Sequence, residues 1–173
     1  MKKFFCLTII SMFLLLISCT DSTKTSTDNT GMSQADENLA KNSRVYKAIE
    51  TGDAATLDSL ISSDAVDHQG PNGTEIKGTD NVKHMLADIH NHLKDGKFEV
   101  IEAATNGDYI FTLARVTGTT ADSTWGMPPG SKVDEKGVDV VKIRDGKMVE
   151  HWGFVDAAEM MKRMNDTTHM YNK

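Results

Sequence analysis

Two side chains near the end of the chain have the types and spacing of an acid/base pair. Asp139 and His151 flank residues 144–146 (Arg-Asp-Gly) in a stretch rich in Val and Ile, which is typical of a β-hairpin. If residues 144–146 form a three-residue turn with Gly146 left-handed, Asp139 lies directly opposite His151 on one face of the sheet. The carboxylate then holds one imidazole nitrogen and raises its basicity, so that His151 serves as a general base near neutral pH.

Two alternatives remain open for this pair. If the turn has only two residues, Val140 faces His151 and the pair with Asp139 is lost. Otherwise His151 is a half-buried sheet histidine bonded to a neighbouring group.

Other residues capable of chemistry give weaker indications. His84, Asp88 and His92 follow one side of an expected helix at four-residue steps, but that side points away from the apolar stripe of the helix. No cysteine accompanies them, so we interpret the three as a solvated face and expect no metal. The sequence has no glycine-rich phosphate loop and no Gly-x-Ser-x-Gly motif, and we expect no organic cofactor.

Helices precede strands in the pattern of apolar residues. Helical spacing runs through residues 38–61, with a break at 51–53, and returns at 79–93 after a short extended piece at 65–69. Strand-like segments separated by turn sequences follow at residues 97–104, 108–119, 132–144 and 147–155. Because these strands are consecutive we expect antiparallel pairing, and the order of elements predicts an α+β domain.

The first residues have the features of a bacterial lipoprotein precursor. Lys2 and Lys3 precede an uncharged apolar run that is long enough for export but short for a membrane span. The run ends in residues 16–19 (Leu-Ile-Ser-Cys), which resemble the lipobox whose cysteine is acylated and becomes the new N-terminus. We predict a signal peptide at 1–18, lipidation of Cys19, and a place in the bacterial cell envelope, at the outer membrane or the periplasmic face. The alternative is an ordinary secretory peptide in which Cys19 is incidental.

Composition sets the other limits of the chain. Residues 19–35 are mostly Ser, Thr and Asp and predict a flexible tether, 36–164 have the length of one domain, and 165–173 form a polar tail. The net charge of -6 argues against nucleic acid as a partner and leaves the lipid anchor as the expected membrane contact. Cleavage removes Cys6 and leaves one acylated cysteine, so we expect neither a disulfide nor a cysteine nucleophile.

Two motifs carry a resemblance to a known family. Residues 126–130 (Gly-Met-Pro-Pro-Gly) precede a strand, and residues 145–152 (Asp-Gly-Lys-Met-Val-Glu-His-Trp) lie in the last hairpin. With the order of elements, they resemble the SnoaL-like polyketide cyclase family of the nuclear transport factor 2-like superfamily over about residues 38–164. The resemblance implies a cone-shaped fold, in which a curved antiparallel sheet wraps the N-terminal helices and leaves a pocket at its wide end. It also implies a homodimer packed through the outer face of the sheet.

The resemblance does not carry the family's reaction to this chain. The cyclases use an aspartate that removes a proton from a substrate carbon, and the resemblance places that aspartate at Gly153, which cannot accept a proton. His151 matches a family histidine, whereas Asp139 falls where a histidine is found and Gly137 where a glutamine is found. The aldol cyclisation is therefore not transferred.

Further pocket residues follow from the same resemblance. Asp67 and His68 lie on a short strand that contributes to the pocket in this fold, so either can approach a polar group of a ligand. The alternative for His68 is a surface histidine. Trp125 and Met127, beside the Met-Pro-Pro loop, are expected as an apolar rim of the pocket or as packed anchors of the loop.

Apolar residues also alternate along the other face of the last hairpin. Val138, Val140, Met148 and Trp152 are expected on the outer face of the sheet. Such a face predicts either a homodimer surface or a face covered by another part of the same chain.

Three functions fit these observations. The first is an envelope lipoprotein whose pocket binds a small, partly apolar molecule, which the missing base at Gly153 favours. The second is a cofactor-free acid/base enzyme, an ester cyclase, isomerase or hydrolase, with His151 as base and Asp139 as its partner. The third is a structural subunit that docks other envelope proteins, which no residue supports positively.

Overall fold

The helices begin and end at residues that cap them. The structure is a computed structural model that describes residues 32–70 and 73–161. The helices are α1 (Gln34–Thr51), α2 (Ala54–Leu60) and α3 (Thr79–His92). The Ser33 hydroxyl accepts the backbone N–H of Asp36 at the start of α1, and Gly52, with a φ of 67°, ends it. The predicted break at 51–53 is the turn between α1 and α2.

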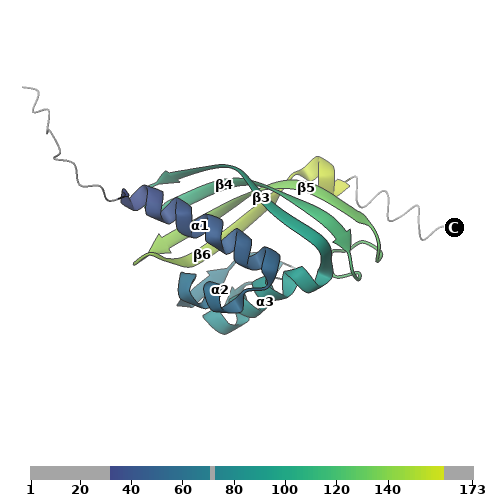
Figure 1. The fold of residues 1–173 in the computed structure, drawn as a ribbon, viewed down its shortest axis with the longest axis horizontal. Coiled ribbons are helices and arrows are strands. Elements are labelled where there is room, and N and C mark those ends of the chain that lie inside the picture. The colour runs from purple at the N-terminus through teal and green to yellow at the C-terminus, as the bar shows by residue number, and fades with distance from the viewer. Residues whose placement is uncertain (1–31, 71–72, 162–173) are drawn as a thin grey trace, which may run out of the picture. The chain divides into compact units, whose positions relative to one another are not determined.

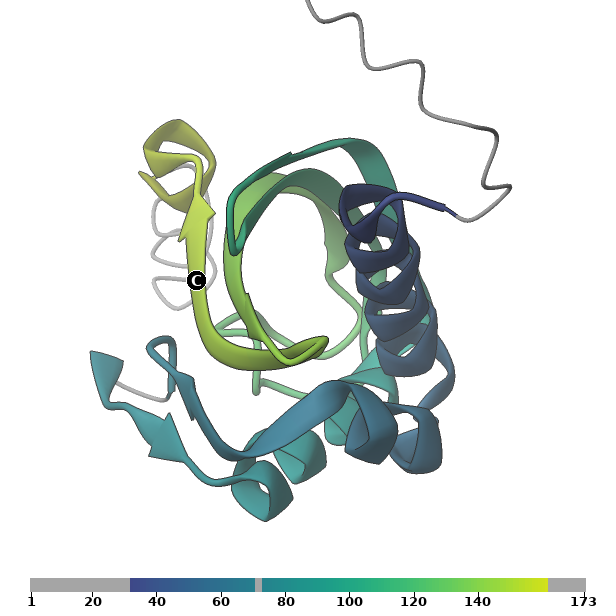
Figure 2. The ribbon, with the colours of Figure 1, turned by 90° about the vertical axis from the view of Figure 1, so that its left-hand side faces the viewer.

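One curved sheet lies against these helices (Figures 1 and 2). Its strands are β1 (Ile61–Asp67), β2 (Ile76–Lys77), β3 (Leu93–Asn106), β4 (Tyr109–Thr120), β5 (Lys132–Arg144) and β6 (Lys147–Val155), in the order β2-β1-β6-β5-β4-β3. The long strands β3 to β6 pair antiparallel in sequence order, as predicted. Figure 2 shows them curling round, with α1 across the open side of the curl. The α+β class and the cone-shaped fold are confirmed.

One strand pair departs from the antiparallel pattern. β1 pairs parallel with β6, and the partners there are Val66 with Glu150 and Asp67 with His151. Antiparallel pairing was expected because the long strands are consecutive, but β1 is separated from β6 by most of the domain, so no short turn fixes its direction. This pairing places a residue from the first half of the chain beside His151.

The turn between β5 and β6 differs from the three-residue turn that the sequence suggested. Arg144 pairs with Lys147, so only Asp145 and Gly146 form the turn. Both have positive φ, 53° and 71°, which is the geometry of the tight hairpin turns that match strand twist. Of the two alternatives for this turn, the three-residue turn is therefore wrong and the two-residue turn is confirmed.

An extra residue in β6 then shifts the register. Ile143 pairs with Met148, but Lys142 pairs with Glu150, which leaves Val149 as a β-bulge. Met148 and Val149 are both buried although they are neighbours, because the bulge interrupts the alternation of faces.

The bulge returns Asp139 and His151 to one face of the sheet. Val141 pairs with His151, and Asp139 pairs with Gly153. Neither expected partner, Asp139 or Val140, lies directly opposite His151. Asp139 lies diagonally, two positions along, where long side chains on one face still meet.

The main core lies between the helices and the concave face of the sheet. Its most buried members come from both layers: Leu57, Ile61, Val82 and Ile110 are at most 1% exposed. A second cluster of Leu93, Met127 and Val133 packs at the far end of β3. Burying these side chains supplies the main driving force for the fold.

The outer face of the sheet carries exposed apolar side chains. Cross-strand partners there include Leu113 with Val138, and Val138 with Phe154. Phe111, Leu113, Val138 and Phe154, which we call the outer patch, are 38–58% exposed, so the described part of the chain leaves them largely open. Met148, expected on this face, is instead buried on the concave side because of the bulge.

The predicted signal peptide, Cys19, most of the tether and the whole polar tail fall outside the described residues. Within the described residues, no helix is long and apolar enough to cross a membrane.

Candidate functional site

A cavity of about 240 Å³ lies between the concave face of the sheet and helices α1 and α3. Its wall is mostly apolar and includes Ile49, Leu86, Phe98, Val116, Trp125 and Met148. Its polar groups are Asn42, Tyr46, Gln69, Asp139 and His151. An enclosed apolar space with a few polar groups is the usual form of a small-molecule site.

His151 is held between two carboxylates. Its Nδ1 lies 2.7 Å from Asp67 Oδ2, and its Nε2 lies 3.4 Å from Asp139 Oδ1. Asp67 is 1% exposed and also accepts the backbone N–H of Gln69 at 2.7 Å. The structure thus brings together three predicted site residues, Asp67, Asp139 and His151.

This setting makes the imidazole a cation at neutral pH. Burial alone would lower the pKa of His151, but its hydrogen bonds and attraction to Asp139 and Asp67 outweigh burial and raise the pKa to about 9. Because a carboxylate only accepts hydrogen bonds, both ring nitrogens must donate to satisfy both partners. The group between the carboxylates is an imidazolium.

Tyr46 extends this chain of hydrogen bonds along the cavity. Its hydroxyl donates to Asp139 Oδ2, so both oxygens of that carboxylate have a donor. Burial, with the negative charge of Asp139, raises the pKa of Tyr46 far above its usual range and keeps the phenol protonated. Nearby, Asn42 donates to Thr112 Oγ1 at 2.9 Å, and both residues are buried.

The side chain of Gln69 occupies the space beside Gly153. Its amide nitrogen donates to the backbone carbonyl of Gly153, and a Cβ added at Gly153 would lie 2.0 Å from Gln69 Oε1. The same Cβ would lie 3.0 Å from Asp139 Oδ1. A side chain at 153 would therefore displace the side chain of Gln69 from its present position.

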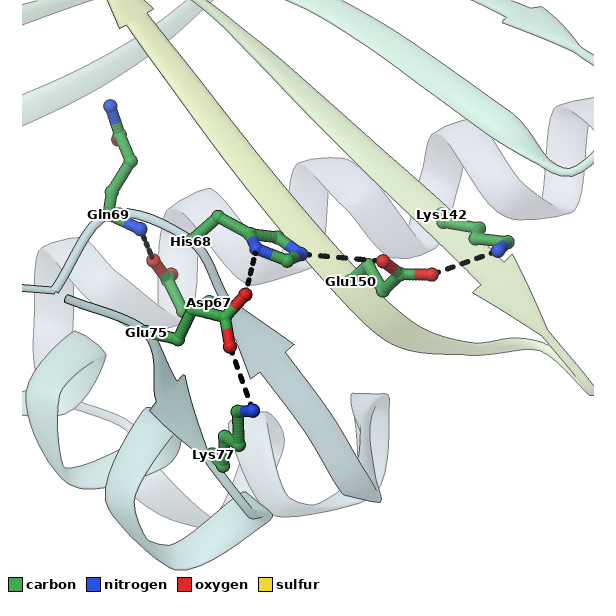
Figure 3. A network of polar contacts seen from close by, with 7 residues as sticks. All are labelled: Asp67, His68, Gln69, Glu75, Lys77, Lys142 and Glu150. Carbon is green, nitrogen blue, oxygen red and sulfur yellow. Dashed lines mark hydrogen bonds and ion pairs between the residues drawn. The ribbon is translucent and has the colours of Figure 1, made fainter. Parts of the chain in front are cut away.

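His68 lies on the other side of the sheet from the cavity. Its ring stacks on Trp152 with centroids 4.6 Å apart, and its nitrogens contact Glu75 at 3.0 Å and Glu150 at 3.3 Å. Figure 3 shows this network, which continues from Glu150 to Lys142. The expectation that His68 lines the pocket is corrected, because neighbouring residues of a strand point to opposite faces and Asp67 takes the inner one.

Trp125 and Met127, near the Met-Pro-Pro loop, have different environments. Trp125 lines the cavity, as expected for its rim. Met127 is 7% exposed and packs with Leu93 and Val133, so it anchors the loop instead.

On α3, His92 contacts Asp88 at 2.9 Å and Asp122 at 2.6 Å.

The sequence analysis missed three polar residues of the site, Asn42, Tyr46 and Gln69. Asn42 and Tyr46 are four residues apart on α1, which places them on one helix face. A buried asparagine within an apolar helical stripe was the available signal for Asn42. Gln69 lay in a turn sequence and gave none.

The geometry supports proton transfer. Asp139, a carboxylate at the cavity wall, is hydrogen-bonded to a protonated imidazole and to a phenol. Asp139 can therefore accept a proton, while the imidazolium and the phenol stabilise the charge of its carboxylate.

A sequence profile of the family described as SnoaL-like polyketide cyclase matches residues 40–164. A search of curated proteins gave no match.

Solved structures of the same fold come from several bacteria. A protein from Jannaschia sp. CCS1, assigned as a SnoaL-like polyketide cyclase, has a TM-score of 0.65 at 18% identity, over 77% of this chain and 96% of that chain. IdmH from Streptomyces antibioticus, assigned as a polyketide cyclase, has a TM-score of 0.60 at 26% identity, over 74% and 98%. An LEH-like epoxide hydrolase from M. tuberculosis has a TM-score of 0.62 at 14% identity, over 76% and 87%.

The ionisation of His151 is open to direct measurement. We expect ¹⁵N NMR of the imidazole to show a midpoint near pH 9, and Asp67→Asn to lower it by roughly 1–3 units by removing one acceptor. Since the pKa of the folded state exceeds the ordinary value of 6.5, His151 stabilises the fold fully below about pH 6.5. That stabilisation is lost as the pH rises through 9.

The control is Asp145→Asn, in the exposed β5–β6 turn, which should leave the midpoint unchanged. A midpoint at or below 6.5 in the unmodified chain would show that the two carboxylates do not hold the imidazolium.

Proposed function

The chain belongs to the SnoaL-like polyketide cyclase family, and from this membership we propose that it is an acid/base enzyme working without a cofactor on a small, mostly apolar molecule. The observation that carries the proposal is the hydrogen-bonded series Asp67–His151–Asp139–Tyr46 at the wall of an apolar cavity. A buried series of ionisable groups is costly to form, and such groups gather at sites of proton transfer.

Asp139 is the residue that accepts the proton in this proposal. A histidine that keeps its proton to about pH 9 cannot serve as a base at neutral pH, so the roles first expected for His151 and Asp139 are exchanged. Asp139 takes a proton from the substrate, while the Nε2–H of His151 and the hydroxyl of Tyr46 hold its oxygens in place. The proton then returns from Asp139 to another atom of the substrate or to water.

The position of Asp139 agrees with the chemistry of the family. The family resemblance puts the proton-accepting aspartate at 153, and Asp139 is the direct cross-strand partner of Gly153. Its Oδ1 lies 3.0 Å from where a Cβ at 153 would stand. A carboxylate is thus present where the family's base would be, supplied by the neighbouring strand.

The similar structures support the class of reaction but no particular substrate. Their names include polyketide cyclases and an epoxide hydrolase. An isomerase, an ester cyclase and a hydrolase of the acid/base type can each use an accepting carboxylate.

A binding module is the second candidate, and the side chain of Gln69 favours it. Gln69 fills the place of a residue-153 side chain and presents an amide to the cavity, which is a feature of ligand orientation rather than of proton transfer. In this function the cavity holds a small, partly apolar molecule and releases it unchanged.

We also propose that the chain acts as a lipid-anchored protein of the bacterial envelope and as a homodimer. The anchor is supported by the lipobox-like residues before Cys19, and the dimer by the outer patch.

Loss of Asp139 should abolish proton transfer. We expect the full chain to catalyse exchange of deuterium from D₂O into members of a panel of small cyclic ketones and β-keto esters, followed by ¹H NMR. Asp139→Asn should slow this exchange by about 10²–10⁴-fold, because the general base is removed while the cavity keeps its shape.

Asp145→Asn, the same chemical change in an exposed turn, should exchange like the unmodified chain. Exchange undiminished in Asp139→Asn would contradict the assignment of the base. No exchange with any compound, together with tight binding of one of them, would favour the binding module.

A charge placed in the outer patch should dissociate the dimer. Val138 lies between Leu113 and Phe154 across the strands, so Val138→Asp buries a carboxylate in any interface formed there. Sedimentation should show a dimer for the unmodified chain and a monomer for the variant, with Ser59→Asp on the exposed surface of α2 as the control. A dimer in both would place the interface elsewhere.

Lipidation should depend on Cys19. In cells fed with a labelled fatty acid, the unmodified chain should carry the label and sediment with membranes, whereas Cys19→Ser should do neither. Cys6→Ser is the matched control and should keep the label. An unlabelled wild-type chain would favour the ordinary secretory peptide.

A further inference from the structure

We infer that the cavity selects ligands by charge: it takes an uncharged or cationic molecule that donates a hydrogen bond to Asp139, and it rejects the corresponding carboxylate. The inference rests on the proposed function only in taking this cavity as the ligand site. It specifies the charge and the hydrogen-bonding character of the substrate, which the names of the family and of the similar structures leave open.

The first step is the net charge of the hydrogen-bonded series. Asp67 and Asp139 contribute two carboxylates, and His151 contributes one positive charge between them. Tyr46 is neutral, since burial and Asp139 keep its phenol protonated. The series therefore carries one net negative charge, wherever its protons lie within it.

The second step is that no cation of the cavity wall balances this charge. Within residues 32–70 and 73–161, no lysine or arginine lines the cavity. The nearest candidate along β5, Lys142, contacts Glu150 at 2.9 Å in the network around His68 on the outer side of the sheet. An incoming anion would meet uncompensated negative charge in an apolar space, where charge repulsion is strong.

The third step is the direction of the hydrogen bonds. Tyr46 and His151 both donate to Asp139, so their protons already have an acceptor. The remaining donors are the amides of Asn42 and Gln69, each of which directs one N–H to an oxygen of the protein, and the indole N–H of Trp125. Each Asp139 oxygen accepts one hydrogen bond, from Tyr46 or from His151, and has a further lone pair. The site therefore offers acceptors to a ligand more readily than donors.

The fourth step concerns the rest of the ligand. Phe98 and Trp125 line the cavity with Leu86 and Met148, so the body of the molecule contacts aromatic and aliphatic side chains. Aromatic faces attract cations and disfavour anions, which acts in the same direction as the charge of Asp139.

Three isosteric probes test the inference. Benzamidinium, benzamide and benzoate share a planar aromatic skeleton and differ in charge and in donors. Titration calorimetry with the full chain at pH 7 should show binding in the order benzamidinium, benzamide, benzoate, with at least about a tenfold difference in Kd between the first and the last.

A charge-neutralising variant gives the matched comparison. Asp139→Asn brings the net charge of the series to zero, so benzamidinium should lose about tenfold in affinity and benzoate should gain. Asp145→Asn makes the same change in an exposed turn and should leave the order and the affinities unaltered.

The inference is overturned if benzoate binds the unmodified chain as tightly as benzamidinium, if the order survives in Asp139→Asn, or if none of the three binds. These outcomes are separate from those of the exchange assay. A chain that selects ligands by charge but transfers no proton would support this inference and contradict the proposed enzyme. A chain that transfers a proton but does not select by charge would support the proposed enzyme and contradict this inference.

Discussion

The imidazolium of His151 buried between Asp67 and Asp139 constrains much of the structure around it. A charge removed from water must have partners at both ring nitrogens, and each partner must come from a different strand. The parallel pairing of β1 with β6 supplies one of these partners, because its register sets Asp67 alongside His151. The helices contribute the last member of the series through Tyr46. The hydrogen-bonded series is therefore distributed over α1, β1, β5 and β6, and it forms only when these four elements are packed together.

The β-bulge at Val149 has a simple role in that assembly. Side chains alternate between faces along a strand, so a two-residue turn without a bulge would put Asp139 and His151 on opposite sides of the sheet. One added residue in β6 changes the parity and brings both to the concave side. The same shift turns Met148 inward, where it becomes part of the cavity wall. A local irregularity thus decides which residues of the hairpin face a ligand.

The sequence contained enough to predict the elements, the α+β class and the family, since those depend on periodicity, turn residues and short motifs. It also indicated Asp139 and His151 as a pair, although by the wrong turn and the wrong register. Residue types alone do not distinguish a tight turn followed by a bulge from a longer turn. Here the shorter turn and the extra residue in β6 have opposite effects on the register, so Asp139 and His151 still share a face. Contacts between segments far apart in the sequence could not be predicted from residue types and local spacing. The bond from Asp67 to His151 depends on a parallel pairing that no local pattern encodes, and the outward direction of His68 depends on which of two neighbours faces in.

The glycine at 153 bears on how this site can change over time. Its missing side chain leaves room for Gln69 and for the carboxylate of Asp139, so a second carboxylate at 153 would stand almost in contact with the first. The two positions are alternative places for one negative charge and cannot both be occupied without displacing neighbours. Adding a carboxylate at 153 while Asp139 remains would displace Gln69 and set two negative charges close together. The exchange of one arrangement for the other is therefore least costly when the carboxylate at 139 is removed first, or when a smaller residue at 69 accompanies the change.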